Sequence, residues 1–192
     1  MYDPKKTMTA VLIHSFAVAH AATAALLAPT LVGDEAALTV LTIAMVIAVA
    51  KLNGADWDTG SALAFLGVMA GTYLGTRGAV FLVKWIPGIG SIANAATTTV
   101  VTEILGWSTY LFVKKGLSPE TTSEATAKAI YNEAKNLRNE VKDEGEKAYE
   151  SMSNKDKNEF DNIMKELKNK DLPDSTREYL TNRMISILEK YK

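Results

Sequence analysis

Residues 89–113 read IGSIANAATTTVVTEILGWSTYLFV, and this stretch decides the fold class. It carries one charged residue, Glu103, and does not alternate apolar and polar residues as a half-buried strand does. Three comparable stretches cover residues 8–32, 36–50 and 61–83, and they are rich in Ala and Leu, which favour helix. We therefore predict an all-α fold built on Ala/Gly-rich hydrophobic helical hairpins.

Charge divides the chain into two unlike parts. Residues 1–116 carry 7 Lys or Arg and 6 Asp or Glu, whereas residues 117–192 carry 14 and 16. We predict a hydrophobic, membrane-associated helical domain at 1–116 and a soluble, charged helical domain at 117–192. Because acids and bases alternate in the second part, no basic surface for nucleic acid is expected.

The apolar stretches approach the length of membrane spans. A helical span needs about 20 apolar residues, which three stretches reach and residues 36–50 do not. The positive-inside rule places lysines on the cytoplasmic side of a membrane. The lysines at both outer ends and at one turn then fit four membrane segments with both termini in the cytoplasm, but Lys84, in the third turn, does not fit this topology. The lysines that fit are Lys5, Lys6, Lys51, Lys114 and Lys115.

Glu103 is the main obstacle to a membrane span, because a carboxylate in a bilayer costs a few kcal/mol unless it is paired or protonated. The sequence offers Arg77 and Lys84 as partners, so these three residues form a candidate buried ion pair or proton site. The alternative is a helix packed in protein, with Glu103 at its solvated edge.

Glycines recur in the third apolar stretch at Gly67, Gly71 and Gly75, followed by Gly78. A spacing of four places them on one helix face, where another backbone can approach closely. In water each would cost about 1 kcal/mol relative to alanine. We therefore predict close helix packing through this face, within the chain or between copies in a homo-oligomer.

The segment GIGSIA at residues 88–93 matches the G-x-G-x-x-A turn of dinucleotide-binding proteins. Such a turn should follow a strand, but a Gly-rich apolar helix precedes this one. We interpret it as a helix break, in which Pro87 ends one helix and Gly88 and Gly90 permit a tight return. No cofactor is predicted.

Other candidate sites are weak. His14 and His20 are six residues apart and do not share a helix face, so they suit helix contacts better than a metal. The segment DWDTG at 56–60 begins like a calcium loop but lacks the glutamate at position twelve, so Asp58 or Thr59 serves better as a helix N-cap. The chain has no cysteine and no nucleophile motif, and we expect no enzyme.

Several landmarks together resemble the YcjF-like family, known as domain of unknown function 697. They are HAATAALLAP at 20–29, a turn at Asp34, LTIAMVIAVAKLNG at 41–54 and IPGIGSIANAATTTVVTEILGW at 86–107. The resemblance implies a helical, membrane-associated domain that works beside a GTPase, which would here be a separate chain. The chain departs from the family at Thr42, where glutamine is common.

The charged part predicts three helices. Ser118 can cap the first, whose apolar stripe at Ile130, Ala134, Leu137, Val141, Ala148 and Met152 is broken at Glu144 or Gly145. Residues 154–170 predict the second helix, and Asp174 or Ser175 caps the third. Short connections favour an antiparallel arrangement.

Three functions remain open at this point. The leading hypothesis is a non-enzymatic, membrane-associated scaffold or partner-binding protein that works with a GTPase. The alternative is a soluble homo-oligomer, or a protein that passes from a soluble to an inserted form as pore-formers do. A third class, an enzyme or transporter, would use Glu103 with Arg77.

Overall fold

The computed structural model of the chain describes residues 3–27, 35–74, 95–169 and 171–191. All regular secondary structure in these ranges is helical, which confirms the predicted all-α class. The helices are α1 (Pro4–Leu27), α2 (Glu35–Leu52), α3 (Thr59–Leu74), α5 (Ala95–Lys114), α6 (Glu124–Ser151), α7 (Asn154–Leu167) and α8 (Asp174–Leu188), followed by a 3-10 turn, η2 (Glu189–Tyr191).

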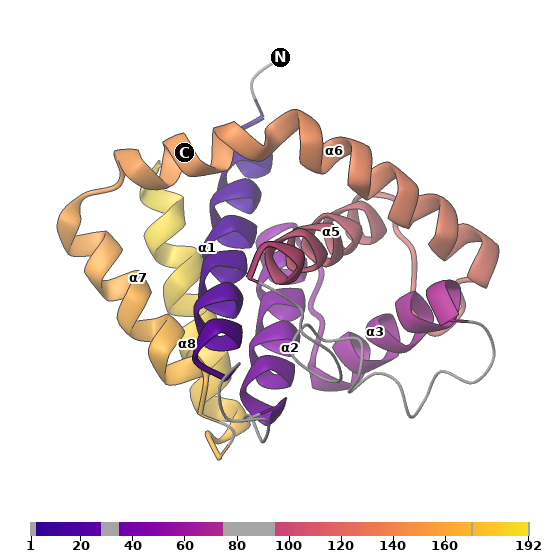
Figure 1. Cartoon of the computed structure of the whole chain (residues 1–192), viewed down its shortest axis with the longest axis horizontal. Helices are drawn as coiled ribbons and strands as arrows, with labels where there is room; N and C mark the ends of the chain where they lie inside the picture. Colours follow the sequence, from indigo (N-terminus) through magenta and orange to yellow (C-terminus); the bar gives the residue numbers. More distant parts are fainter. Residues whose placement is uncertain (1–2, 28–34, 75–94, 170, 192) are drawn as a thin grey trace.

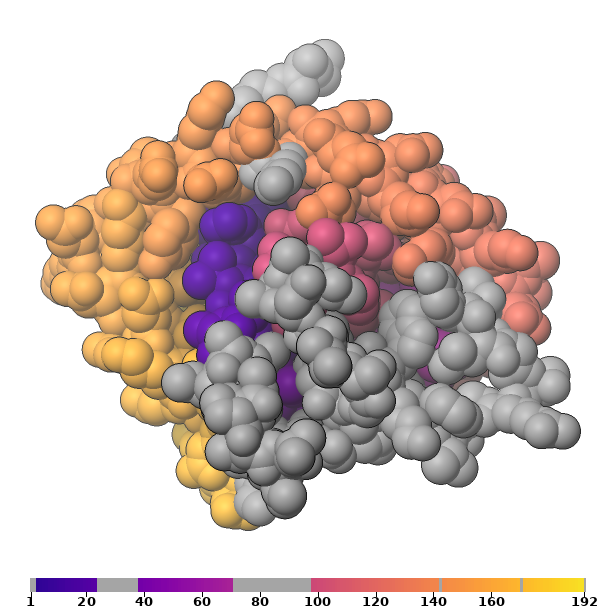
Figure 2. All heavy atoms as spheres, viewed as in Figure 1, coloured from indigo at the N-terminus to yellow at the C-terminus, as the bar shows by residue number. Residues whose placement is uncertain are grey.

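The charged helices lie over the apolar ones. Helix α6 crosses α1 and α5 and continues to α3, so that it covers three apolar helices along its length (Figure 1). Helices α7 and α8 pack against each other and against α2. In the face shown in Figure 2, the atoms of α6 and α7 form the upper and left outline, with α1 visible beside them.

Local side chains set where the helices begin. The Asp58 carboxylate accepts a hydrogen bond of 2.8 Å from the backbone amide of Ser61, which confirms Asp58 as the N-cap of α3. The prediction that Ser118 caps the next helix is wrong. Helix α6 starts six residues later, where the Ser123 hydroxyl accepts a hydrogen bond of 3.2 Å from the amide of Thr126.

One hydrophobic cluster contains residues from both sides of position 116. Phe16, Phe65 and Phe112 belong to it, and so do Ile130 of α6 and Phe160 of α7. The division into domains at 1–116 and 117–192 stays a prediction. The observed packing means that the apolar helices bury much of their surface against charged helices of the same chain.

Helix α5 is the most enclosed element. Every residue from 102 to 112 is buried, including Glu103, Ser108 and Thr109. A helix that is apolar on all sides is stable only where other elements or lipid surround it. Here α1, α2 and α6 surround it.

Close helix contacts occur at two glycines that the sequence did not single out for packing. A Cβ on Gly106 of α5 would lie 2.6 Å from Cγ1 of Ile13, and a Cβ on Gly145 of α6 would lie 2.8 Å from the carbonyl oxygen of Ala10. The prediction that Gly145 breaks the stripe of α6 is therefore wrong. Gly145 is buried and continues the stripe, since only glycine lets the α1 backbone approach this closely.

We expect Gly145→Ala to lower the free energy of unfolding by about 1 to 2 kcal/mol. Overpacking costs about 1 to 3 kcal/mol and outweighs a gain of up to about 1 kcal/mol in helix propensity. Gly67→Ala is the matched control, because no described atom lies within 4 Å of a Cβ there. It should stabilise the protein by up to about 1 kcal/mol. Urea unfolding of both variants measures the difference, and equal effects would contradict the contact at Ala10.

Asp156 ties α7 to the end of the chain. Its carboxylate accepts hydrogen bonds of 2.6 Å from the Lys190 ammonium, 2.7 Å from the Tyr191 hydroxyl and 3.0 Å from the Ser153 hydroxyl. The Tyr191 hydroxyl in turn accepts from the amide of Ser153 at 2.8 Å. The bond from Lys190, followed by the one from Tyr191, lowers the pKa of Asp156 to about 2.

This shift predicts a pH-dependent contribution to stability. Because the folded pKa of Asp156 lies below its usual value of 3.8, its contribution is complete above about pH 4 and is lost as the pH falls toward 2. Asp156→Asn should therefore destabilise the protein in urea unfolding at pH 6, and by less at pH 3. Asp143→Asn removes the same charge from the exposed face of α6 and controls for net charge. A pH-independent difference between wild type and Asp156→Asn would contradict this role.

Candidate functional site

Glu103 forms an ion pair inside the helix assembly. Its Oε2 lies 2.5 Å from Nε of Arg138, and the two side chains are 6% and 16% exposed. Glu103 comes from α5 and Arg138 from α6, so the pair joins the most enclosed helix to its charged cover. Nη1 of Arg138 also donates a hydrogen bond of 3.2 Å to Oδ1 of Asn139, which fixes the guanidinium plane.

Arg138 was missed as the partner of Glu103. Arg77 and Lys84, which the sequence suggested, lie outside the described residues. A sequence signal did exist, because Arg138 follows Ile130 and Ala134 at steps of four and so falls on the buried face of α6. A cation on an otherwise apolar helix face needs a buried anion, and Glu103 is the anion that α5 supplies.

A small cavity of about 10 Å³ adjoins the ion pair and is lined by His14, Glu103, Trp107 and Arg138 among others. Its volume is about that of one water molecule, so no organic substrate fits beside Glu103. Nδ1 of His14 is buried here and makes no hydrogen bond to a described residue. The geometry suits a structural contact that holds α6 on α5.

His20 is a buried contact between α1 and α2. Its Nδ1 donates to the carbonyl of Phe16 at 2.7 Å, and its Nε2 lies 3.0 Å from the Thr42 hydroxyl. Burial lowers the pKa of His20 to about 4, so the ring is neutral at pH 7 and Nε2 is an acceptor. The Thr42 hydroxyl therefore shares its proton between His20 and the carbonyl oxygen of Leu38, which lies 2.9 Å away. Thr42 is the position at which the family resemblance predicts glutamine.

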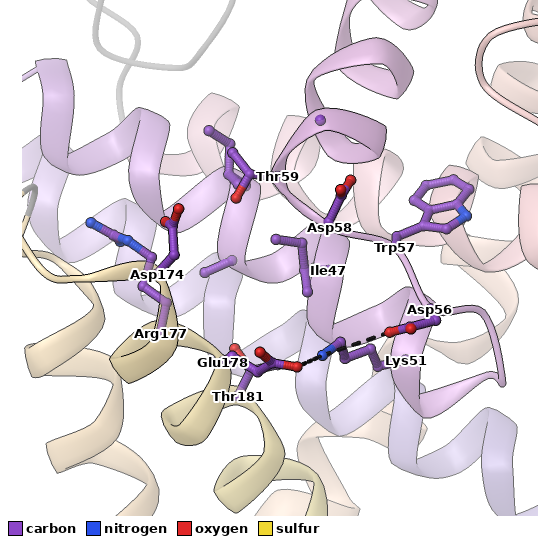
Figure 3. A pocket seen from close by; sticks show the side chains of 13 residues that line it. Ile47, Lys51, Asp56, Trp57, Asp58, Thr59, Asp174, Arg177, Glu178 and Thr181 are labelled. Atoms are coloured by element: carbon purple, nitrogen blue, oxygen red, sulfur yellow. Dashed lines mark hydrogen bonds and ion pairs between the residues drawn. The ribbon is translucent and has the colours of Figure 1, made fainter.

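A cavity lies between α2, the start of α3 and the start of α8. It has a volume of about 410 Å³, large enough for a small organic ligand. Ile43, Ala44 and Ile47 of α2 give it an apolar wall. Figure 3 shows Asp174 and Arg177 on the side of α8 and Trp57 on the opposite side, with Ile47 between them.

Polar groups gather at the edge of this cavity. Lys51 lies 2.7 Å from Glu178 and 3.9 Å from Asp56, and dashed lines mark both contacts in Figure 3. The amide and hydroxyl of Ser61 donate to Asp58 and hold the pKa of Asp58 below its usual range, so this carboxylate is ionised at neutral pH. The sequence had pointed to residues 56–60 only as a poor calcium loop and a helix cap.

The described ranges hold no group of three or more acidic or histidine residues arranged to bind a metal ion. Among the helices of those ranges, none combines the length and apolarity needed to cross a membrane, so predicted membrane spans find no support there.

The predicted glycine face is only partly described. Gly67 lies in α3 with no described atom close to it, and the surroundings of Gly71, in the same helix, fall outside the described residues. Gly75, Gly78, Gly88 and Gly90 also lie outside them, as does the predicted helix break. The packing role of these glycines stays a prediction.

Comparison of the chain with protein-family models, curated proteins and solved structures finds no match. The resemblance to the YcjF-like family, and the GTPase partner that it implies, therefore stay predictions. What the site geometry defines is a helical protein with a buried, ion-paired apolar helix and a cavity of ligand size.

Proposed function

We propose that this chain is a non-enzymatic helical protein that engages a membrane with its apolar helices when the charged helices that cover them move away. The observation that carries the proposal is the enclosure of α5, buried at every residue from 102 to 112 under α1, α2 and α6. Lipid satisfies an all-round apolar helix as well as protein does, so protein and lipid are alternative covers for it.

Besides the apolar contacts of Ile130 and Val141, two ion pairs join α6 to α5 and its C-terminal end. Glu103 pairs with Arg138, and at the end of α5 Lys115 lies 3.2 Å from Glu133 of α6. The exposed Lys115–Glu133 pair contributes about 0 to 1 kcal/mol, whereas the buried Glu103–Arg138 pair is the costlier one to open because Glu103 then loses its cation. Lipid would replace the apolar contacts that α6 makes with the helices beneath it, and α6 would then be free to bind a partner protein. In this proposal the partner is the expected GTPase or a second copy of the chain.

A cross-link tests whether α6 must move. The chain contains no cysteine, so Lys115→Cys with Glu133→Cys creates the only two thiols, and a short bis-maleimide joins α6 to the end of α5. We expect the uncross-linked variant to float with liposomes and the cross-linked one to remain unbound. The matched control carries Lys128→Cys and Asn132→Cys, two exposed positions one turn apart within α6, where the cross-link leaves α6 free to move.

Flotation and fractionation have clear opposing outcomes. Equal liposome binding by both cross-linked proteins would contradict the release of α6. Complete recovery of the wild-type chain in the supernatant, with no flotation at all, would contradict membrane engagement itself. A monodisperse oligomer in light scattering under those conditions would support the alternative, a soluble homo-oligomer.

A further inference from the structure

We propose that the cavity between α2, α3 and α8 binds an alkylammonium group, carried either by a small polyamine or by a lysine side chain of a peptide. This function is separate from membrane engagement, because none of the residues that line the cavity belongs to α5 or α6. Three features of the cavity lead to this class of ligand.

The first feature is the combination of size and apolar wall. A volume of about 410 Å³ lies within the range of about 300 to 1,000 Å³ that is usual for ligand sites. Ile43 and Ile47 present aliphatic surface, and Trp57, a residue that is 9% exposed, lines the opposite side. A chain of methylene groups packs well against such surfaces, as the stem of a lysine does.

The second feature is an excess of negative charge. Four carboxylates and two cations line the cavity, so its formal charge is 2 − 4 = −2. Lys51 already contacts Glu178 and Asp56, which leaves this cation poorly placed to attract an anion. The net field therefore favours a cation and disfavours phosphate or a carboxylate. The other residues counted in this formal charge are Asp58, Asp174 and Arg177.

The third feature is the Thr181 hydroxyl. Thr181 of α8 is 2% exposed and lines the cavity, yet its hydroxyl makes no hydrogen bond within the described part of the chain. Its oxygen is not one of the fully enclosed polar atoms that lack a partner, so it is accessible from the cavity. An ammonium group has three donors and no acceptor, so it can donate to this oxygen while the carboxylates accept its other protons.

Calorimetric titration of the full chain with 1,6-diaminohexane tests the proposal. We expect saturable binding at one site, no binding of 1-hexanol, which has the methylene chain without the charge, and no binding of inorganic phosphate. Asp56→Asn with Asp174→Asn should weaken the diamine about tenfold, because it removes two of the attracting charges. Glu146→Gln, on the exposed face of α6, should leave the affinity unchanged.

Thr181→Val tests the hydroxyl separately, since it keeps the shape of the side chain. It should weaken the diamine by about three- to tenfold, the usual effect of one lost hydrogen bond. Absence of diamine binding to the wild type, binding of phosphate in its place, or equal weakening by Glu146→Gln would each overturn the proposal. Circular dichroism of each variant verifies that the helices remain folded.

The same titration distinguishes the two sources of the ligand. Spermidine and a short peptide with one lysine are compared, with an ε-acetylated copy of the peptide as the uncharged control. Tighter binding of spermidine assigns the site to a small polyamine, and tighter binding of the lysine peptide assigns it to a protein partner. Equal binding of the acetylated and unmodified peptides would overturn the role of the ammonium group.

Discussion

Arg138→Met should lower the free energy of unfolding by about 3 to 5 kcal/mol, which is a large part of the stability of a domain of this size. The reason is that Glu103, whose side chain is 6% exposed, would keep its carboxylate in a buried site without its cation. The loss comes from a stranded charge, so it should exceed the value of the ion pair itself. Urea unfolding followed by circular dichroism measures it.

A double variant separates these two quantities. Glu103→Leu with Arg138→Met replaces both charges by apolar groups of similar size and should restore most of the lost stability. Lys115→Met provides the exposed control, because Lys115 and Glu133 are 45% and 48% exposed, and it should cost no more than about 1 kcal/mol. A double variant that is less stable than Arg138→Met would contradict the buried ion pair.

The sequence predicted the elements of this fold better than their contacts. Apolar runs and caps are local properties, so the helical class and the cap at Asp58 could be predicted from short windows. The pairing of Glu103 with Arg138 joins residues 35 positions apart, and no local pattern specifies which helix face lies over which. Arg77 and Lys84, the predicted partners, lie in the apolar part with Glu103, whereas Arg138 lies in the charged part.

The cavity shows the same limit for a site. Ile47, Trp57 and Asp174 come from three separate elements, and each alone has an ordinary structural explanation as a core, loop or first-turn residue. Only the packing of α8 on α2 brings them together. The prediction that Asp174 or Ser175 caps α8 is wrong, because Pro173 occupies the N-cap position and no side chain caps the helix. Thr181 gave no signal in the sequence, since a threonine within an amphipathic helix is common and its missing hydrogen bond appears only in three dimensions.

Phe112→Ala should have an effect as large as Arg138→Met, about 3 to 5 kcal/mol, but for a different reason. Phe112 of α5 is fully buried, and its ring meets that of Phe65 edge-on at 5.0 Å between centroids and 86° between planes. Removal of the ring takes away apolar contacts and this aromatic pair, and it leaves a cavity that rigid helices cannot close. Leu63→Ala, at a side chain 43% exposed on α3, is the matched control and should cost less than about 1 kcal/mol.

The effect of Phe112→Ala should also reach the ligand cavity, because Phe65 stands between Phe112 and Trp57. The Trp57 and Phe65 rings are 5.6 Å apart, so a Phe65 ring that moves into the vacated space withdraws support from one wall of that cavity. Diamine binding should therefore weaken in Phe112→Ala under conditions where the protein is still folded, and remain normal in Leu63→Ala. If Phe112→Ala instead unfolds no more easily than Leu63→Ala, then α5 is not enclosed as described. Equal stability of the two variants would also contradict the proposal that α6 covers α5. The ligand site would still be tested by direct titration of the wild type with the diamine.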